Sequence, residues 1–326
     1  LWQNRLNLSF NYYKSFVDHM LTLKTLGGVS GLRNYWSNDG KMENQGFDIS
    51  VTAKVLALKD FSWEISAGLG HYKNEVTALP DGDKPVYTSL YGGEVVTQVG
   101  GPVGLFYGYK TQGVFSTSED AAFAGLRDGR ADGDVFRGGD MHFADLVADG
   151  VIDEKDKTVI GDPNPDIFGN FGTSLHYKNW TLNAFFSYSL GNDIYNYQRA
   201  VLEGGSTYYN QTTAVLNRWT SEGQVTEIPR AELGDPMGNS RFSDRWIEDG
   251  SYLKLKTLSL SYRIPFNYTF LQGITVWAAA NNVFTCTKYL GSDPELSISS
   301  SAVGQGIDRG LLGRGRSFVL GVKINL

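Results

Sequence analysis

The chain has 326 residues, of which 41% are hydrophobic and 13% aromatic, and its formal net charge is −6. No apolar run approaches the roughly 20 residues that a membrane-spanning helix requires, and the acidic balance offers no basic surface for nucleic acid. Abundant aromatic residues, 39 glycines and only 9 prolines favour many strands separated by turns. We therefore expect an all-β protein. The start at Leu1, without a charged and then apolar leader, favours a chain cut from a longer protein.

Alternation of apolar and polar residues predicts strands along the whole chain. It begins at Leu6, where Leu6, Leu8 and Phe10 alternate with polar residues, which places apolar side chains on one face of a strand. Similar patterns end at Leu326. About eight membrane spans are predicted: a strand from Leu6, then residues 47–57, 61–75, 168–177, 180–190, 252–263, 273–283 and 316–326.

The connections between these strands alternate between short and long. Lys59-Asp60 and Lys178-Asn179 make tight turns, whereas other connections are long and rich in Gly, Asp, Asn and Ser. Outer-membrane barrels show this asymmetry, with short periplasmic turns and long extracellular loops. Residues 76–167 are therefore predicted to form a long extracellular excursion, in which Val103–Phe115 is a candidate hairpin. The apolar phase shifts within 252–263, which indicates a bulge or a protruding upper half of that strand.

A barrel wall requires its two faces to meet different solvents. We expect one set of side chains to face lipid and another to face the lumen. The predicted lipid-facing residues are Leu6, Leu8, Phe10, Ile49, Leu182, Phe186, Leu320 and Ile324, and the predicted lumen-facing residues are Asn7, Ser50, Asn183, Lys323 and Asn325.

Several ordered segments resemble the SusC/RagA family of TonB-dependent outer-membrane transporters from Bacteroidetes-type bacteria. They occur in this order: Asn11-Tyr12-Tyr13-Lys14, Asn44-Gln45-Gly46-Phe47-Asp48, Gly108-Tyr109-Lys110, Gly113-Val114-Phe115, Ser243-Asp244-Arg245-Trp246-Ile247-Glu248-Asp249-Gly250-Ser251-Tyr252-Leu253-Lys254-Leu255-Lys256, Asn281-Asn282-Val283-Phe284-Thr285, Thr287-Lys288-Tyr289 and Asp293-Pro294-Glu295. The resemblance runs from the first strand to the last.

The resemblance implies that residues 1–326 are the C-terminal part of one TonB-dependent receptor barrel, a transmembrane antiparallel β-barrel of about 22 strands. It implies an importer of glycans or oligopeptides in a Gram-negative outer membrane. A SusD-like lipoprotein and the TonB complex are the implied partners, with the plug and the remaining strands absent from this chain and the C-terminus periplasmic. The alternatives are a passive porin-like or autotransporter-like barrel and a secreted carbohydrate-binding β-sandwich.

One acidic segment has the spacing of a calcium loop. Counting Asp145 as the first position, the four carboxylates of Asp145, Asp149, Asp153 and Asp156 occupy positions one, five, nine and twelve, with Gly150 at six. Position three is Val147, and the last ligand is the shorter Asp, so a low affinity for Ca²⁺ is expected. The alternative is an acidic turn that orders the loop without metal.

Aromatic residues in the long connections are candidates for ligand or partner contact, namely Tyr195, Tyr208, Tyr209 and Trp219. Flat rings stack on sugars, and the same rings pack loops together or meet a partner protein. The four histidines lie far apart and no nucleophile motif occurs, so we expect no enzyme activity. The single cysteine, Cys286, is interpreted as a small loop residue.

About eight strands would close into a barrel filled by side chains, with no passage for a large nutrient. An open sheet would instead expose unpaired backbone groups to hydrocarbon. The strand near residues 3–16 and the strand near 316–326 are therefore predicted to pair with strands outside this sequence, and not with each other.

Overall fold

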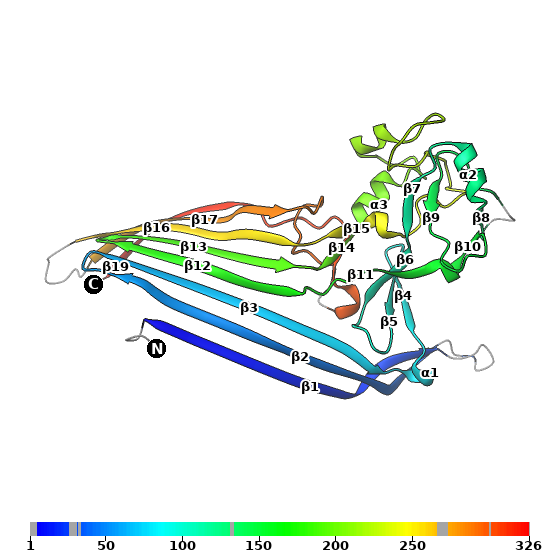
Figure 1. The fold of residues 1–326 in the computed structure, drawn as a ribbon. Helices are drawn as coiled ribbons and strands as arrows, with labels where there is room; N and C mark the ends of the chain where they lie inside the picture. The colour runs from blue at the N-terminus through cyan, green and yellow to red at the C-terminus, as the bar shows by residue number, and fades with distance from the viewer. Residues whose placement is uncertain are drawn as a thin grey trace.

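The computed structural model describes residues 5–25, 31, 34–130, 134–265, 273–299 and 301–325. Its main feature is a curved antiparallel sheet of eight strands in the order β1-β2-β3-β12-β13-β16-β17-β19. The bounds of these strands are β1 (Leu6–Thr25), β2 (Asn34–Ala57), β3 (Phe61–Ala78), β12 (Ile167–Tyr177), β13 (Trp180–Leu190), β16 (Tyr252–Ile264), β17 (Gly273–Thr287) and β19 (Ser317–Asn325). Figure 1 shows these strands side by side, with both marked termini at one end and the smaller elements at the other.

All eight predicted strands are present, and several of them extend beyond the predicted limits. β1 continues to Thr25, β2 begins earlier, at Asn34, β3 continues to Ala78 and β17 continues to Thr287. Cys286 consequently lies in a strand, exposed and paired with Leu253, so its interpretation as a loop residue is wrong. The last residue of the predicted alternation, Leu326, lies outside the described residues.

The register extends the apolar alternation across the sheet, because directly paired residues share a face. One continuous row is apolar and consists of Leu8, Val51, Ala67, Phe171, Phe186, Leu255 and Phe284. The adjacent row is polar or glycine and consists of Ser9, Ser50, Gly68, Asn170, Ser187, Lys254 and Thr285. The two predicted sets of side chains therefore occupy opposite faces.

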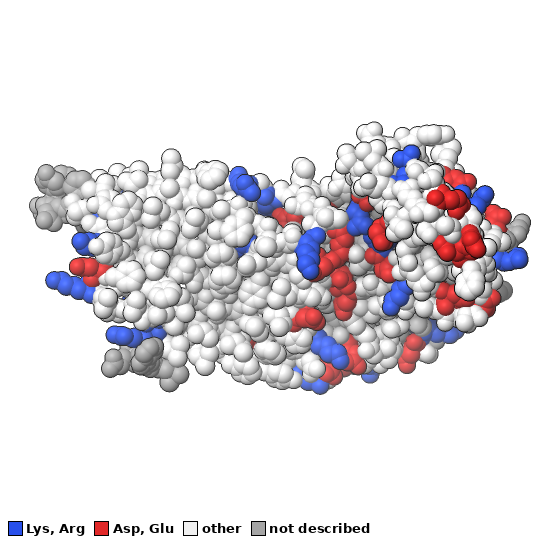
Figure 2. Space-filling model, turned by 45° about the horizontal axis from the view of Figure 1, so that its top comes forward, with Lys and Arg blue, Asp and Glu red and all other residues white. Residues whose placement is uncertain are grey.

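Among the described residues, no buried apolar cluster lies over the apolar face of the sheet. Phe10 is 62% exposed and Leu320 is 83% exposed on this face. Both clusters of buried apolar residues lie instead in the long connections, at the end of the sheet that is opposite the two termini. Figure 2 shows that the face in view over the long sheet is nearly free of charge, while charged residues gather toward the two ends of the molecule. A continuous exposed apolar surface of this kind is the surface of a sheet that meets a nonaqueous phase or a partner.

Large rings cover glycines on neighbouring strands. A Cβ added at Gly70 would lie 2.8 Å from the Cζ of Phe168, and one added at Gly46 would lie 2.6 Å from the hydroxyl oxygen of Tyr13. The pairs Phe168–Gly70 and Tyr13–Gly46 lie opposite each other in the register. Such aromatic–glycine pairs allow a sheet to bend without leaving a gap in its surface.

The predicted irregularity of β16 is a bulge at Lys256. Thr257 pairs with Phe185 and Leu255 with the adjacent Phe186, so Lys256 is an extra residue relative to β13. On the other side Leu255 pairs with Phe284 and Thr257 with Asn281, so two residues of β17 lie opposite Lys256. The extra residue explains why the apolar phase shifts along this strand while its apolar side chains stay on one face.

The sheet is open between its first and last strands. Among the described residues, β1 pairs only with β2 and β19 only with β17, so these two strands are its edges. Within the described residues β1 and β19 are not paired with each other, and the pairing of these two edges with strands outside this sequence stays a prediction. None of the described helices is long and apolar enough to cross a membrane.

Candidate functional site

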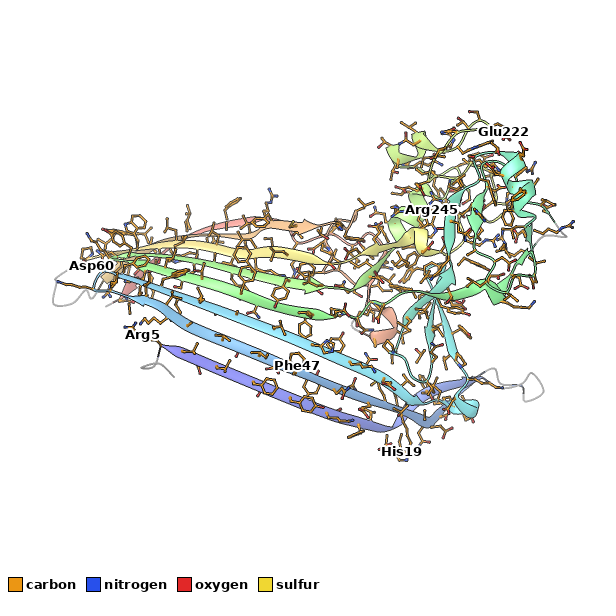
Figure 3. All side chains as sticks on the ribbon, in the orientation of Figure 1. Arg5, His19, Phe47, Asp60, Glu222 and Arg245 are labelled. Carbon is orange, nitrogen blue, oxygen red and sulfur yellow. The ribbon has the colours of Figure 1, made fainter. Side chains whose placement is uncertain are left out.

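The long connections fold together at one end of the sheet, and we call residues 79–166, 191–251 and 288–316 the loop layer. Its strands are β4 (Val86–Leu90), β5 (Gly93–Thr97), β6 (Leu105–Tyr109), β7 (Thr111–Val114), β8 (Arg127–Asp128), β9 (Met141–Phe143), β10 (Val151–Ile152), β11 (Lys157–Gly161), β14 (Asp193–Asn196), β15 (Ile247–Asp249) and β18 (Ile307–Asp308). Its helices are α1 (Pro80–Asp83), α2 (Ser118–Ala124), α3 (Tyr197–Glu203) and the 3-10 helices η2 (Glu154–Asp156), η3 (Thr213–Asn217), η4 (Asp244–Trp246) and η5 (Ala302–Gly304). In Figure 3 the labelled Glu222 and Arg245 lie in this layer, whereas Asp60 lies at the opposite, short-turn end.

The candidate hairpin at Val103–Phe115 is wrong. β6 pairs with β5 and β11, whereas β7 pairs with β9 in a separate sheet. Only Lys110 separates β6 from β7, and antiparallel hairpins commonly need at least two connecting residues. The chain therefore runs from one small sheet into the next.

The loop layer has two apolar cores of its own. The first contains Phe115, Phe136, Met141, Phe143 and Ile152, and the second contains Val95, Phe106, Tyr195, Trp246 and Ile307. Residues of the second core come from three different connections of the long sheet, those after β3, β13 and β17. The loops are therefore held together by burial, like a small globular domain, and not by their strand ends alone.

Two of the segments that carry the family resemblance contact each other in this layer, where Tyr109 and Ser243 form an isolated parallel β-bridge. Residues beside the two segments reinforce this contact. Tyr109 N donates to the carbonyl oxygen of Phe242 at 3.2 Å. The Asp244 carboxylate accepts hydrogen bonds from Thr111 N at 3.0 Å and from the Thr111 hydroxyl at 2.6 Å. These bonds attach the connection after β3 to the connection after β13.

A second pair of these segments meets where the loop layer joins the sheet. Lys254 Nζ lies 2.8 Å and 3.0 Å from the two carboxylate oxygens of Asp293, and 2.7 Å from Glu295. Lys256, the bulge residue, also donates to Glu295 at 2.5 Å. The side chains of Lys254 and Asp293 are only 3% and 5% exposed. The connection after β17 is thus fastened to the polar face of β16 by buried ion pairs.

Burial and charge act in opposite directions on Glu295. Burial opposes its ionisation, but the hydrogen bonds and charges of Lys254 and Lys256 outweigh that effect and hold the pKa of Glu295 below its ordinary value. The carboxylate is therefore the stable form in this cluster at neutral pH.

The predicted calcium segment forms a compact acidic turn in the connection between β3 and β12. Asp145 accepts hydrogen bonds from the backbone N–H groups of Ala148 and Gly150 at 2.6 Å and 2.7 Å. Asp156 is fully buried and accepts from Leu146 N and Asp153 N, both at 2.9 Å.

The other two predicted ligands of this segment contact Lys155. Its Nζ lies 3.6 Å from Asp149 and 3.3 Å from Asp153. Within the described ranges, no three acidic, histidine or cysteine side chains converge as a metal ion would require. Backbone amides and Lys155 therefore occupy carboxylate oxygens that calcium would use, and calcium binding stays a prediction.

The four aromatic candidates have different environments. Tyr195 is 3% exposed, and its hydroxyl donates to the carbonyl oxygen of Tyr91 at 3.0 Å. Trp219 is half-buried, and its indole N–H donates to the carbonyl oxygen of Ser116 at 3.0 Å. Tyr208 and Tyr209 are 89% and 71% exposed. Only this last pair presents most of its surface for contact with another molecule.

The loop layer also contains a charged hollow that was not predicted from the sequence. It has a volume of about 320 Å³, and its charged lining residues are Glu94, Arg130, Glu154, Lys157 and Arg241. Arg241 lies in the connection between β13 and β16 and the other four are spread over the connection between β3 and β12, and the five share no motif. The sequence signal that was available is weak, namely Arg241 two residues before the Ser243–Lys256 segment.

No family model matches the chain. The chain is 33% identical over 339 residues to TonB-dependent receptor P3 of Formosa agariphila, an alignment that covers 99% of this chain and 33% of that receptor. It is 26% identical over 329 residues to TonB-dependent receptor SusC of Bacteroides thetaiotaomicron, with 96% of this chain and 29% of SusC covered.

Solved structures with a similar fold include the RagAB peptide importer. In its 'open-open' state the TM-score is 0.79 at 23% identity, covering 100% of this chain and 33% of the matched chain. In its 'closed-closed' state the TM-score is 0.77 at 24% identity, covering 99% and 34%. The chain spans about one third of the length of the curated relatives it matches. The chain is thus similar over nearly its whole length to TonB-dependent receptors that include SusC, and its open eight-stranded sheet forms part of a larger transmembrane β-barrel.

Proposed function

We propose that the chain supplies part of the wall and the extracellular loops of a TonB-dependent importer of glycans or oligopeptides that works with a SusD-like surface lipoprotein. The observation that carries this proposal is the combination of one exposed apolar sheet face with a folded loop layer at a single end of the strands. A barrel wall needs the apolar face, and capture of a large nutrient needs a shaped surface at one rim. The relatives named TonB-dependent receptors support the coupling to TonB.

The proposal includes an orientation in which the loop layer is extracellular and the short turns and C-terminus are periplasmic. A labelling experiment on intact cells tests it, using the full-length receptor with Cys286→Ser as background. Leu312→Cys lies in the loop layer at a position that is 95% exposed, and Lys59→Cys lies in a short turn. A membrane-impermeant maleimide should label Leu312→Cys on intact cells and Lys59→Cys only after permeabilisation. The reverse pattern would contradict the orientation.

Uptake measurements test the function itself. Cells that depend on the full-length receptor should lose growth on its nutrient when TonB is deleted, and regain it when TonB is restored. A passive porin-like or autotransporter-like barrel, the alternative function, would pass small solutes equally well without TonB. Uptake that is unaffected by TonB deletion would therefore favour this alternative.

We also propose that Tyr208 and Tyr209 contact the lipoprotein partner. They share the connection between α3 and β15 with Leu216 and Val225, which are 77% and 89% exposed, so this connection presents several apolar side chains. Exposed apolar and aromatic residues that cluster on a surface are typical of partner interfaces. Replacing both tyrosines by serine should reduce recovery of the lipoprotein with the affinity-purified receptor, while Phe123→Ser, at a 95% exposed position of α2, serves as the matched control.

A further inference from the structure

The charged hollow of the loop layer lies among β5, β6, η2, β11 and the segment before η4. Its charges form two groups that meet at the ring of Tyr109. Lys157 Nζ lies 5.7 Å from the centre of that ring, and the Arg241 guanidinium carbon lies 5.0 Å from it.

The first group has more positive than negative charge. Arg130 and Arg241 each place an Nη2 on the same carboxylate oxygen of Asp128, at 2.9 Å and 3.1 Å, and the Asp128 side chain is fully buried. Burial alone would raise the pKa of Asp128, but hydrogen bonding from Arg130 and the charge of Arg241 lower it. One ionised carboxylate therefore serves two guanidinium groups, which leaves an excess of one positive charge among these three side chains, while the charge of Asp235 also acts on Arg130.

This excess positive charge is accompanied by a buried hydrogen-bond donor that has no acceptor. The side chain of Arg241 is only 6% exposed, and its Nη1 is buried with no hydrogen-bond partner among the described residues. Arg130 is 45% exposed and uses its Nε and Nη2 on Asp128. A ligand can therefore reach Arg130, with the charge of Arg241 behind it. A buried cationic donor without an acceptor is costly, so an oxyanion here would be stabilising.

The second group has the opposite excess. Lys157 Nζ lies 3.0 Å from one carboxylate oxygen of Glu94 and 2.6 Å from one of Glu154. Two carboxylates thus share one ammonium group, and the side chain of Glu154 is 77% exposed. This group carries an excess of one negative charge and presents an accessible carboxylate to a cationic donor.

An aromatic surface accompanies the charges. Tyr107 lines the hollow and packs against Tyr87 at a ring-centre distance of 5.1 Å. Burial, with smaller effects from Tyr87, raises the pKa of Tyr107 to about 12, so the phenol stays neutral. The hollow therefore combines a positive side, a negative side and an apolar surface.

We propose that this hollow binds a zwitterionic ligand, such as a short peptide with free termini, with its carboxylate at Arg130 and its ammonium group at Glu154. The inference rests on the proposed importer function and specifies a substrate class for it. A simple anion would be repelled by Glu94 and Glu154, and a simple cation by Arg130 and Arg241. A ligand with both charges satisfies both groups.

Triglycine is the probe, titrated calorimetrically into the detergent-solubilised full-length receptor that contains this chain. N-acetyl-triglycine removes the ammonium group and triglycinamide removes the carboxylate. Each should bind about ten- to a hundred-fold more weakly than triglycine, which is the loss expected for one charge-assisted hydrogen bond. Equal affinities for the three peptides, or no binding of triglycine, would overturn the inference.

Variants assign the two ends of the ligand. Arg130→Gln should weaken the binding of triglycine about ten-fold or more and leave the already weak binding of triglycinamide unchanged. Glu154→Gln should likewise weaken the binding of triglycine and leave the already weak binding of N-acetyl-triglycine unchanged. The matched controls are Arg127→Gln and Glu119→Gln, which alter exposed residues that do not line the hollow. If Arg130→Gln and Glu154→Gln bind triglycine like the wild type, the site is not this hollow.

The outcomes separate the inference from the proposed function. Triglycine binding that depends on Arg130 and Glu154, in a receptor whose uptake does not require TonB, would support the site and contradict the importer. TonB-dependent uptake together with three equal peptide affinities would support the importer and contradict the site.

Discussion

The long sheet and the loop layer are built from one chain but place their apolar residues in opposite ways. In the sheet, apolar side chains such as Phe318 and Leu320 are 80% and 83% exposed. In the loop layer, Phe106, Phe143 and Trp246 are at most 1% exposed and lie in compact cores. The difference shows that the two regions are adapted to different solvents, hydrocarbon for one sheet face and water for the loops.

Charged residues follow the same division. The apolar row of the sheet that runs from Leu8 to Phe284 contains no charged residue. The loop layer instead buries ion pairs, among them Arg230 with Asp140 at 2.8 Å and Lys254 with Asp293 at the junction with the sheet. Buried charges of this kind are tolerated because each has a partner.

Removing a buried partner should have the largest effect. Lys254→Met leaves the Asp293 carboxylate buried without its cation, which should destabilise the attachment of the last connection by about 3–5 kcal/mol. Hydrogen exchange of residues 289–299 in the full-length receptor measures this as a loss of protection. Lys288→Met, at an exposed lysine near the start of the same connection, is the control. Similar protection in both variants would show that the ion pairs do not hold this connection.

A charge on the apolar face should also be costly, but only on that face. Phe171→Arg places a cation in the apolar row and should cost about 2–4 kcal/mol near the bilayer midplane. Asn170→Arg, one residue earlier in the same strand, points to the polar face and should be tolerated. Heat modifiability on gels after refolding into liposomes compares the folded fractions. Equal losses in the two variants would contradict the assignment of the lipid-facing side.

Acid should release the last connection before it affects the sheet. Because the pKa of folded Glu295 lies below its ordinary value, its ionisation stabilises the folded form above that value, and the stabilisation is lost as pH falls through the lowered pKa. Hydrogen exchange of residues 289–299 should therefore accelerate as pH falls below about 4.5, beyond the intrinsic pH dependence of exchange.

Glu295→Gln should remove most of this acid dependence, whereas Glu119→Gln, at an exposed position of α2, should retain it. An unchanged acid profile in Glu295→Gln would assign the effect to another group.

Calcium should have the smallest effect. We propose a weak site at Asp145, Asp149, Asp153 and Asp156, in which the ion would compete with backbone amides and Lys155 for carboxylate oxygens. At a dissociation constant of about 1 mM, 1 mM Ca²⁺ would stabilise the segment by only about 0.4 kcal/mol. Hydrogen exchange of residues 145–156 with calcium and with a chelator measures this. No change at 10-fold higher calcium would favour an acidic turn that orders the loop without metal.

The sequence by itself determined the eight strands and the sides of their faces, because the period of two is a local property that each strand carries independently. The phase shift in 252–263 was also readable, and it corresponds to the bulge at Lys256. The lengths of β1 and β2 were not, because Asn, Asp and Gly in 34–46 are common in loops and form strand here only through pairing with β1 and β3.

Only the tertiary structure decided the loop layer. Lys254 and Asp293 are 39 residues apart in the sequence. Arg130 and Arg241 come from two different connections of the sheet and both contact the carboxylate of Asp128. The sequence left open whether Tyr195 contacts a ligand or partner or packs loops together, and burial against Phe242 and Phe106 places it in the second core. Such contacts arise from the packing of distant segments, which hydrophobic periodicity does not encode, so the charged hollow became visible only when the loops were placed together.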